Sequence, residues 1–267
     1  MTLREAEKFL RDAGVEDARF DALELICHFE NISRAKAMLC EFSSPELLNA
    51  LHRRADGEPL QYILGEWEFM GIPFKVNEGC LIPRFDTEIL CNYIIENLPK
   101  GGTFADLCTG SGCIACSVLK HRPDSVGTAV ELYPEPFKIA EENAKSLGVS
   151  NRLSLLRADA CTDCLTCQFD IIASNPPYVT AEEMKHLSRE VQKEPVHALT
   201  DGGDGLSVIR SIISYAPSHL KEGGSLAIEI GYMQGKAVTD IAEGYGLTCT
   251  LLRDTGDRDR VAVIKNS

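Results

Sequence analysis

The sequence predicts an α/β protein: a doubly wound, mostly parallel sheet, preceded by a small helical bundle and a hairpin connector. From residue 103 onward, short apolar runs alternate with longer amphipathic segments, which is the pattern of strand–helix–strand units. Before about residue 70, apolar residues instead recur at helical spacing. We therefore expect a helical domain over 1–70, a hairpin linker over 71–85 and a sheet domain over 86–267.

The N-terminal segment carries helix start signals in the expected order. Thr2 is followed three residues later by Glu5, the spacing of a capping box. Ser44, Pro45 and Glu46 place a cap, a first-turn proline and an early acid at the start of a later helix. The apolar stripes of this segment are explained by a helical core. We expect the domain to bind or dock a partner, because it shows no residues arranged for chemistry.

The connector is marked by strand-forming residues between positions 66 and 83. Gly71 and Pro73 interrupt them, which favours a hairpin over one long strand. A helix is expected to begin soon afterwards, with Asp86 or Thr87 as its N-cap.

The sheet domain is expected to alternate strands and helices and to finish with a hairpin of its last two strands. The expected strands are Thr103–Cys108, Val126–Glu131, Leu153–Arg157, Phe169–Ser174, Ser225–Ile230, Leu247–Leu252 and Arg260–Ile264. The expected helices are Cys113–Lys120, Glu135–Leu147 and Gly235–Glu243.

Charge and hydropathy narrow the classes of protein to consider. The formal net charge of −13 argues against a protein that binds mainly a nucleic-acid backbone, because neutralising phosphates supplies most of that affinity. No apolar stretch is long enough to cross a bilayer, and the first residues lack the apolar core of a signal peptide. We expect a cytoplasmic protein with no membrane and no direct nucleic-acid partner.

The eleven cysteines raise the question of a metal site. Cys161, Cys164 and Cys167 have the spacing with which an iron–sulfur or zinc site can begin. No fourth cysteine or histidine follows at ligand spacing. We favour small apolar thiols that fill gaps in packing, and we predict no metal.

The first turn from strand to helix carries glycines that let a ligand approach the backbone closely. The residues of this turn are Cys108, Thr109, Gly110, Ser111 and Gly112. Glu131 ends the next strand, where an acid can hold two ribose hydroxyls. Asp159 or Ala160, after the third strand, would border an adenine ring. These residues together predict a nucleoside site, but they do not distinguish a nicotinamide from a sulfonium cofactor.

The tetrapeptide Asn175-Pro176-Pro177-Tyr178 favours the sulfonium. It follows a buried strand, and its prolines end that strand rigidly at the edge where open α/β sheets bind ligands. The Asn175 side-chain oxygen and the Pro176 carbonyl can both accept hydrogen bonds from one NH2 group. That arrangement orients a weakly nucleophilic nitrogen at a methyl group and stabilises the positive charge that develops on it. We expect Asn175, Pro176 and Tyr178 to be catalytic, with Pro177 completing the substrate-binding turn and Tyr178 packing against the planar group.

Over nearly its whole length the chain resembles the HemK/PrmC family of class I S-adenosylmethionine-dependent methyltransferases. This family methylates a glutamine side-chain nitrogen in peptide chain release factors. The resemblance rests on Pro59–Gly65, Leu81–Glu88, Asp106–Gly112, Asn175–Tyr178, Glu194-Pro195 and Ala198-Leu199.

The resemblance implies a class I methyltransferase Rossmann-like sheet and S-adenosylmethionine as the cofactor. It implies that the methyl donor contacts Cys108–Gly112, Glu131, Ala160 and Asn175, and that Asn175–Tyr178 binds the glutamine. Cys108 stands where many relatives have glycine, which is tolerable if its φ is negative. Ala160 stands where some relatives have a large aromatic residue, so adenine packing is expected to be weaker. Phe85 replaces a frequent proline, a minor change.

Three alternatives stay open. A glutamine methyltransferase acting on a ribosomal protein would differ chiefly in its N-terminal domain. An adenine-N6 nucleic-acid methyltransferase would use the same tetrapeptide, although the net charge and the lack of a basic run count against it. A non-catalytic donor-binding or scaffold protein would have no use for the intact tetrapeptide.

Overall fold

The structure is a computed structural model that describes residues 1–266, and it divides the chain into two compact units. The N-terminal unit comprises Met1–Trp67 and a later segment, Leu187–Lys193. The sheet unit holds the rest of the described chain. The domain limits expected from the sequence, at residues 70 and 85, stay a prediction.

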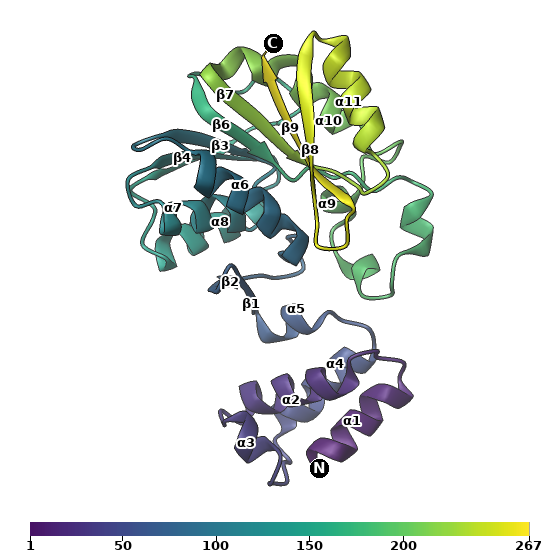
Figure 1. The fold of residues 1–267 in the computed structure, drawn as a ribbon. Helices are drawn as coiled ribbons and strands as arrows, with labels where there is room; N and C mark the ends of the chain where they lie inside the picture. Colours follow the sequence, from purple (N-terminus) through teal and green to yellow (C-terminus); the bar gives the residue numbers. More distant parts are fainter. Residues whose placement is uncertain (267) are drawn as a thin grey trace. The chain divides into compact units, whose positions relative to one another are not determined.

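The N-terminal unit is a bundle of helices around one apolar core (Figure 1). Its helices are α1 (Leu3–Asp12), α2 (Ala18–Phe29), α3 (Arg34–Ala37), α4 (Pro45–Ala55) and α5 (Leu60–Leu64). The predicted capping box is confirmed: Thr2 Oγ1 accepts from the Glu5 backbone N–H at 3.3 Å, and the Thr2 N–H donates to Glu5 Oε2 at 2.7 Å. Ser44 caps α4 through its side chain, with Pro45 in the first turn.

The segment Leu187–Lys193 is bound to the rest of this unit by an ion pair to a buried arginine and by a hydrogen bond to the backbone. Arg54, only 3% exposed, donates through Nε to Asp21 Oδ2 at 2.6 Å and also pairs with Glu190. Arg189 Nη2 donates to the backbone carbonyl of Asp56 at 2.8 Å. A stretch that follows Tyr178 closely along the chain therefore belongs to the N-terminal unit, which the sequence did not indicate.

The strands form two sheets. The connector strands β1 (Glu66–Phe69) and β2 (Ile72–Lys75) pair as the predicted hairpin. The seven-stranded sheet has the order β5-β4-β3-β6-β7-β9-β8, parallel except where β9 pairs with β7 and β8. Its strands are β3 (Thr103–Leu107), β4 (Val126–Glu131), β5 (Leu153–Arg157), β6 (Phe169–Ser174), β7 (Leu220–Glu229), β8 (Leu247–Arg253) and β9 (Asp259–Asn266). The predicted fold class is confirmed.

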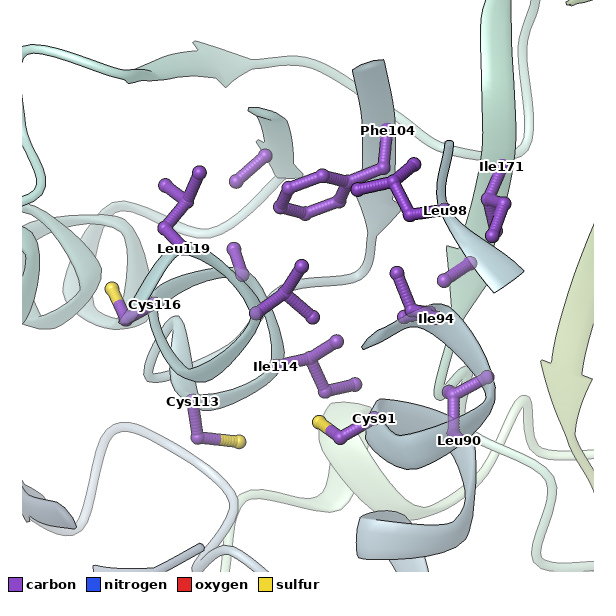
Figure 2. Close-up of a cluster of buried hydrophobic side chains, with 14 of the residues drawn as sticks. Leu90, Cys91, Ile94, Leu98, Phe104, Cys113, Ile114, Cys116, Leu119 and Ile171 are labelled. Carbon is purple, nitrogen blue, oxygen red and sulfur yellow. The ribbon is translucent and has the colours of Figure 1, made fainter. Parts of the chain in front are cut away.

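Helices cover both faces of this sheet, as a doubly wound fold requires (Figure 1). These helices are α6 (Glu88–Asn97), α7 (Cys113–His121), α8 (Pro134–Ser146), α10 (Ser207–Tyr215) and α11 (Gly235–Gly244), and the unit also has the short helix α9 (Val196–Leu199). Alternate residues of β3 enter different cores: Phe104 packs with α6 and α7 side chains, whereas Ala105 and Leu107 pack with those of α10 and α11. Figure 2 shows Phe104, Leu98 and Leu119 as members of one cluster of buried hydrophobic side chains.

The sequence analysis placed no helix between residues 178 and 225, where the structure has α9 and α10. The signal for α10 is present, because Val208, Ile209, Ile212 and Ile213 recur at helical spacing and all but Val208 are fully buried. No helix within residues 1–266 combines the length and apolar character needed to cross a membrane.

Candidate active site

A cavity of about 380 Å³ opens at the carboxyl ends of β3, β4 and β6, within the sheet unit. Most of the predicted site residues line it: Cys108, Thr109, Gly110, Ser111, Glu131, Asp159, Ala160, Asn175 and Pro177. Gly112, Pro176 and Tyr178 are not among the described residues that line the cavity. Strand register explains this convergence, because Leu107 of β3 pairs with both Val130 of β4 and Ser174 of β6.

Gly110 and Gly112 of the turn are glycines for different structural reasons. Gly110 has a φ of +56°, and no atom lies within 4 Å of the position where a Cβ would be. It therefore leaves open space on the cavity wall. Gly112, at φ +79°, would place a Cβ 3.2 Å from the Cβ of Ala140, so glycine lets α7 approach α8 closely.

The condition under which a cysteine is tolerable at position 108, a negative φ, is not met. The φ of Cys108 is +60°, in the left-handed region that costs a residue with a Cβ about 1–2 kcal/mol. The turn imposes this conformation, because the next residue, Thr109, donates its backbone N–H to the Val130 carbonyl at 3.0 Å. A glycine, which has no Cβ, would suit this backbone better than the cysteine of this chain.

Comparing Cys108→Gly with Cys108→Ala isolates that strain. Both variants lose the thiol, but only glycine removes the Cβ. We expect the free energy of unfolding of the glycine variant to exceed that of the alanine variant by about 1 kcal/mol, measured by chemical denaturation. Equal stability of the two variants would show that the backbone at residue 108 is not strained.

Glu131 joins the glycine turn to the end of β4. It is 7% exposed and accepts from the Gly110 N–H through Oε2 at 2.9 Å and from the Tyr133 N–H through Oε1 at 3.0 Å. Each carboxylate oxygen keeps a further lone pair. The fixed carboxylate can therefore accept hydrogen bonds from two neighbouring hydroxyls of a ribose.

Asp106 is buried and accepts hydrogen bonds from residues of the glycine turn and of α7. Its Oδ2 accepts from Thr109 Oγ1 at 2.5 Å and from the Ala115 N–H at 3.2 Å, while Oδ1 has no hydrogen-bond partner among residues 1–266. Burial raises the pKa of this carboxyl to about 7, although the two hydrogen bonds oppose the shift. Asp106 therefore titrates near neutral pH.

The segment after β5 forms the far side of the cavity. Asp159 Oδ1 accepts from the Cys161 N–H at 2.8 Å, and the Ala160 carbonyl accepts from Tyr215 Oη at 2.9 Å. These bonds fix the backbone expected to border an adenine. Within residues 1–266, no three His, Cys, Asp or Glu side chains are grouped to hold a metal ion.

The predicted tetrapeptide follows β6 directly. Asn175 Nδ2 donates to Thr87 Oγ1 at 3.1 Å, and Asn175 Oδ1 accepts no hydrogen bond from the described residues. Tyr178 Oη donates to Glu229 Oε1 at 3.0 Å, away from the cavity wall. The Asn175 amide thus has a free acceptor, whereas the packing of Tyr178 against a substrate stays a prediction.

Sequence reasoning missed several residues of the wall, because tertiary contacts bring them there. Arg84 forms an ion pair with Glu194, whose buried Oε2 also accepts from the Ile82 N–H at 3.1 Å. The rings of Tyr133 and His197 pack with centroids 3.7 Å apart. The segments around Arg84 and Glu194 both contributed to the resemblance, but no local pattern indicates that they pair.

Comparisons with known proteins agree with this arrangement. The PrmC N-terminal domain family matches residues 2–65, and the methyltransferase small domain family matches residues 85–222. In fold, the sheet is similar to a methyltransferase from Pyrococcus furiosus, with a TM-score of 0.57 and 17% identity over 74% of this chain and 91% of that one. It is also similar to a ribosomal protein L11 methylase from Lactobacillus delbrueckii subsp. bulgaricus, with a TM-score of 0.51 and 22% identity over 69% and 81% of the two chains.

Curated relatives match almost end to end. The release factor glutamine methyltransferase of Moorella thermoacetica is 37% identical, and the match covers 97% of each chain. The release factor glutamine methyltransferase of Cereibacter sphaeroides is 40% identical, over 97% of this chain and 95% of that one. By this identity and coverage, the chain belongs to the release factor glutamine methyltransferase family.

Proposed function

We propose that this protein transfers a methyl group from S-adenosylmethionine to the side-chain amide nitrogen of a glutamine in peptide chain release factors. The observation that carries the proposal is the Asn175 amide. Its Nδ2 donates to Thr87, its Oδ1 accepts no hydrogen bond from the described residues, and Asn175 lines the cavity together with Gly110 and Glu131. A hydrogen-bond acceptor for an NH2 group thus lies in the same cavity as a nucleoside-binding turn.

The residues of the cavity fit S-adenosylmethionine. Glu131 can accept from the ribose hydroxyls, and the open space beside Gly110 admits a ligand against the backbone. Asp159 and Ala160 border the adenine position. When bound, the donor supplies a methyl group on an electrophilic sulfonium. The carboxylates of the wall favour a ligand with a positive centre.

Asn175 and Pro176 act on the glutamine. Asn175 Oδ1 and the Pro176 carbonyl accept hydrogen bonds from the two N–H groups of its NH2, which orients the nitrogen lone pair toward the methyl group. As the bond from nitrogen to the methyl carbon forms, the bond from that carbon to the sulfonium sulfur would break and leave a neutral thioether, so positive charge moves to nitrogen, where both acceptors stabilise it. The nitrogen then loses one proton to water, so no strong base is required.

The N-terminal unit is proposed to recognise the body of the release factor. It has its own apolar core and includes Leu187–Lys193, a stretch that continues from the tetrapeptide through a short loop. The reaction is placed in the cytoplasm, where release factors act in translation termination.

The test is a methylation assay with purified release factors and methyl-labelled S-adenosylmethionine, followed by mass spectrometry of the product. We expect one labelled glutamine. A ribosomal protein and an adenine-containing oligonucleotide are assayed in parallel. Label on either of these substrates, with none on release factor, would contradict the proposed function.

A further inference from the structure

The end of β7 lies beside the tetrapeptide. β6 and β7 are parallel, and Ser174 pairs with Ile228, so Asn175, which follows β6, and Glu229, the last residue of β7, lie at the same edge of the sheet. Glu229 is 0% exposed. A buried carboxyl at this position needs an explanation, because charge is removed from water only at a cost unless it is paired.

Two groups from the active site face this carboxyl. Tyr178 Oη donates to Glu229 Oε1 at 3.0 Å, whereas Oε2 has no hydrogen-bond partner among residues 1–266. The Thr87 hydroxyl is close enough to favour the ionised form of Glu229. Arg260, from β9, favours that form as well, and Asp86 opposes it.

Thr87 cannot by itself decide how the Asn175 amide is turned. It accepts from Asn175 Nδ2 at 3.1 Å. A hydroxyl is both a donor and an acceptor, so it would pair equally well with Oδ1 if the amide were flipped. The orientation is decided only if the Thr87 proton is directed elsewhere. The Glu229 carboxyl lies close to the Thr87 hydroxyl, and its Oε2 has no hydrogen-bond partner among residues 1–266.

We propose that Thr87 and Glu229 are positioning residues that fix the Asn175 amide with Oδ1 toward the cavity. The Glu229 carboxylate attracts the Thr87 hydroxyl proton, so Thr87 can only accept from Asn175 and thereby selects Nδ2. The same carboxylate holds Tyr178, so one group anchors both ends of the tetrapeptide. The catalytic consequence rests on the proposed function, in which Oδ1 accepts from the substrate amide.

The chain of contacts from Glu229 through Thr87 to Asn175, here called the relay, predicts that kcat depends on pH. Burial raises the pKa of Glu229 to about 7, although Thr87, Tyr178 and Arg260 oppose the shift. Below that pH the protonated carboxyl no longer requires the Thr87 proton, so the Asn175 amide can turn. We therefore expect kcat to rise with pH through about 7. The pKa of the Asp106 carboxyl is also raised to about 7. A variant of Glu229 is therefore needed to show which of the two carboxyls causes the rise in kcat.

The first test compares Thr87→Val with Thr87→Ser. Valine has the shape of threonine without the hydroxyl, and serine keeps the hydroxyl. We expect Thr87→Val to lower kcat by about 10- to 100-fold, with little change in the dissociation constant for S-adenosylmethionine, and Thr87→Ser to recover most of the loss. Thr239→Val, which removes a half-buried hydroxyl bonded to the Gly235 carbonyl outside the cavity, is the matched control.

The second test uses Glu229→Gln, which keeps the shape of Glu229 but cannot ionise. We expect a lower kcat and loss of the step in kcat near pH 7, while the thermal midpoint stays near that of the wild type at pH 7. A kcat profile in Glu229→Gln that keeps the wild-type step would overturn the role of Glu229 and assign the step to another group.

The third test does not depend on the substrate. The side-chain NH2 resonances of Asn175 are followed by NMR in the ¹⁵N-asparagine-labelled full-length protein and assigned by their loss in Asn175→Ala. We expect strong protection from solvent exchange above pH 7 in the wild type, measured relative to the intrinsic rate at the same pH, and weaker protection below pH 7 and in Thr87→Val. Unchanged resonances in Thr87→Val and Glu229→Gln would overturn the relay. Intact NMR behaviour in a protein that methylates no glutamine would instead contradict the proposed function alone.

Discussion

Replacing Asn175 by alanine is expected to lower kcat for methyl transfer to release factor by about 10²- to 10³-fold. In the proposed reaction, the side chain supplies the acceptor that orients the reacting nitrogen and stabilises its developing charge. Donor binding is expected to weaken less, because we propose that Glu131, Asp159 and Ala160, which also line the cavity, hold the ribose and the adenine. Single-turnover methylation and equilibrium binding of S-adenosylmethionine separate the two effects.

A matched control for this change is Asn97→Ala. Asn97 lies outside the cavity wall on α6, and its amide likewise makes one hydrogen bond, to the Tyr93 carbonyl at 2.8 Å. It should retain wild-type turnover. If Asn175→Ala also retains near wild-type turnover, the catalytic role proposed for Asn175 is wrong.

The second large effect is expected at Gly205. A Cβ added there would lie 2.1 Å from the backbone carbonyl oxygen of Tyr178, and the residue has a φ of +71°. That carbonyl also accepts from Gln234 Nε2 at 2.9 Å, so it is already held in place. We expect Gly205→Ala to cost about 2–4 kcal/mol of stability through overpacking and left-handed strain. By displacing Tyr178, it should also lower kcat about 10²-fold.

Gly202→Ala separates the clash from the backbone strain. Gly202 lies in the same loop at φ +78°, but its Cβ position has no atom within 4 Å. It should lose only about 1 kcal/mol and keep its turnover. Chemical denaturation and steady-state kinetics of both variants provide the test. Equal losses of stability and activity in the two variants would show that Tyr178 does not depend on the space at Gly205.

The strands of the sheet could be predicted closely because their signals are local. Val126–Glu131, Leu153–Arg157 and Phe169–Ser174 have the predicted bounds, since short apolar runs bounded by turn residues are typical of buried parallel strands. Strand β7 begins earlier than predicted, at Leu220, because the glycines inside it masked its first residues.

The role of Thr87 was only partly predictable from its neighbours in the sequence. The sequence predicted that Asp86 or Thr87 caps a helix, and Thr87 does occupy the N-cap position of α6. Its side chain makes no capping hydrogen bond, and its hydroxyl accepts from Asn175, 88 positions away in the chain. A polar residue before a helix signals a cap, but only the tertiary structure shows which groups compete for it.

The sequence by itself determined the alternation of the sheet unit, the glycine turn, the position of Glu131 and the rigid end of β6 at Asn175. Each of these depends on neighbours within a few residues. The tertiary structure decided the left-handed backbone of Cys108, the pairing of Arg84 with Glu194 and the burial of Glu229 between Tyr178 and Thr87. These features depend on strand order and on groups distant in the chain. Local sequence patterns do not predict which buried donor pairs with which acceptor.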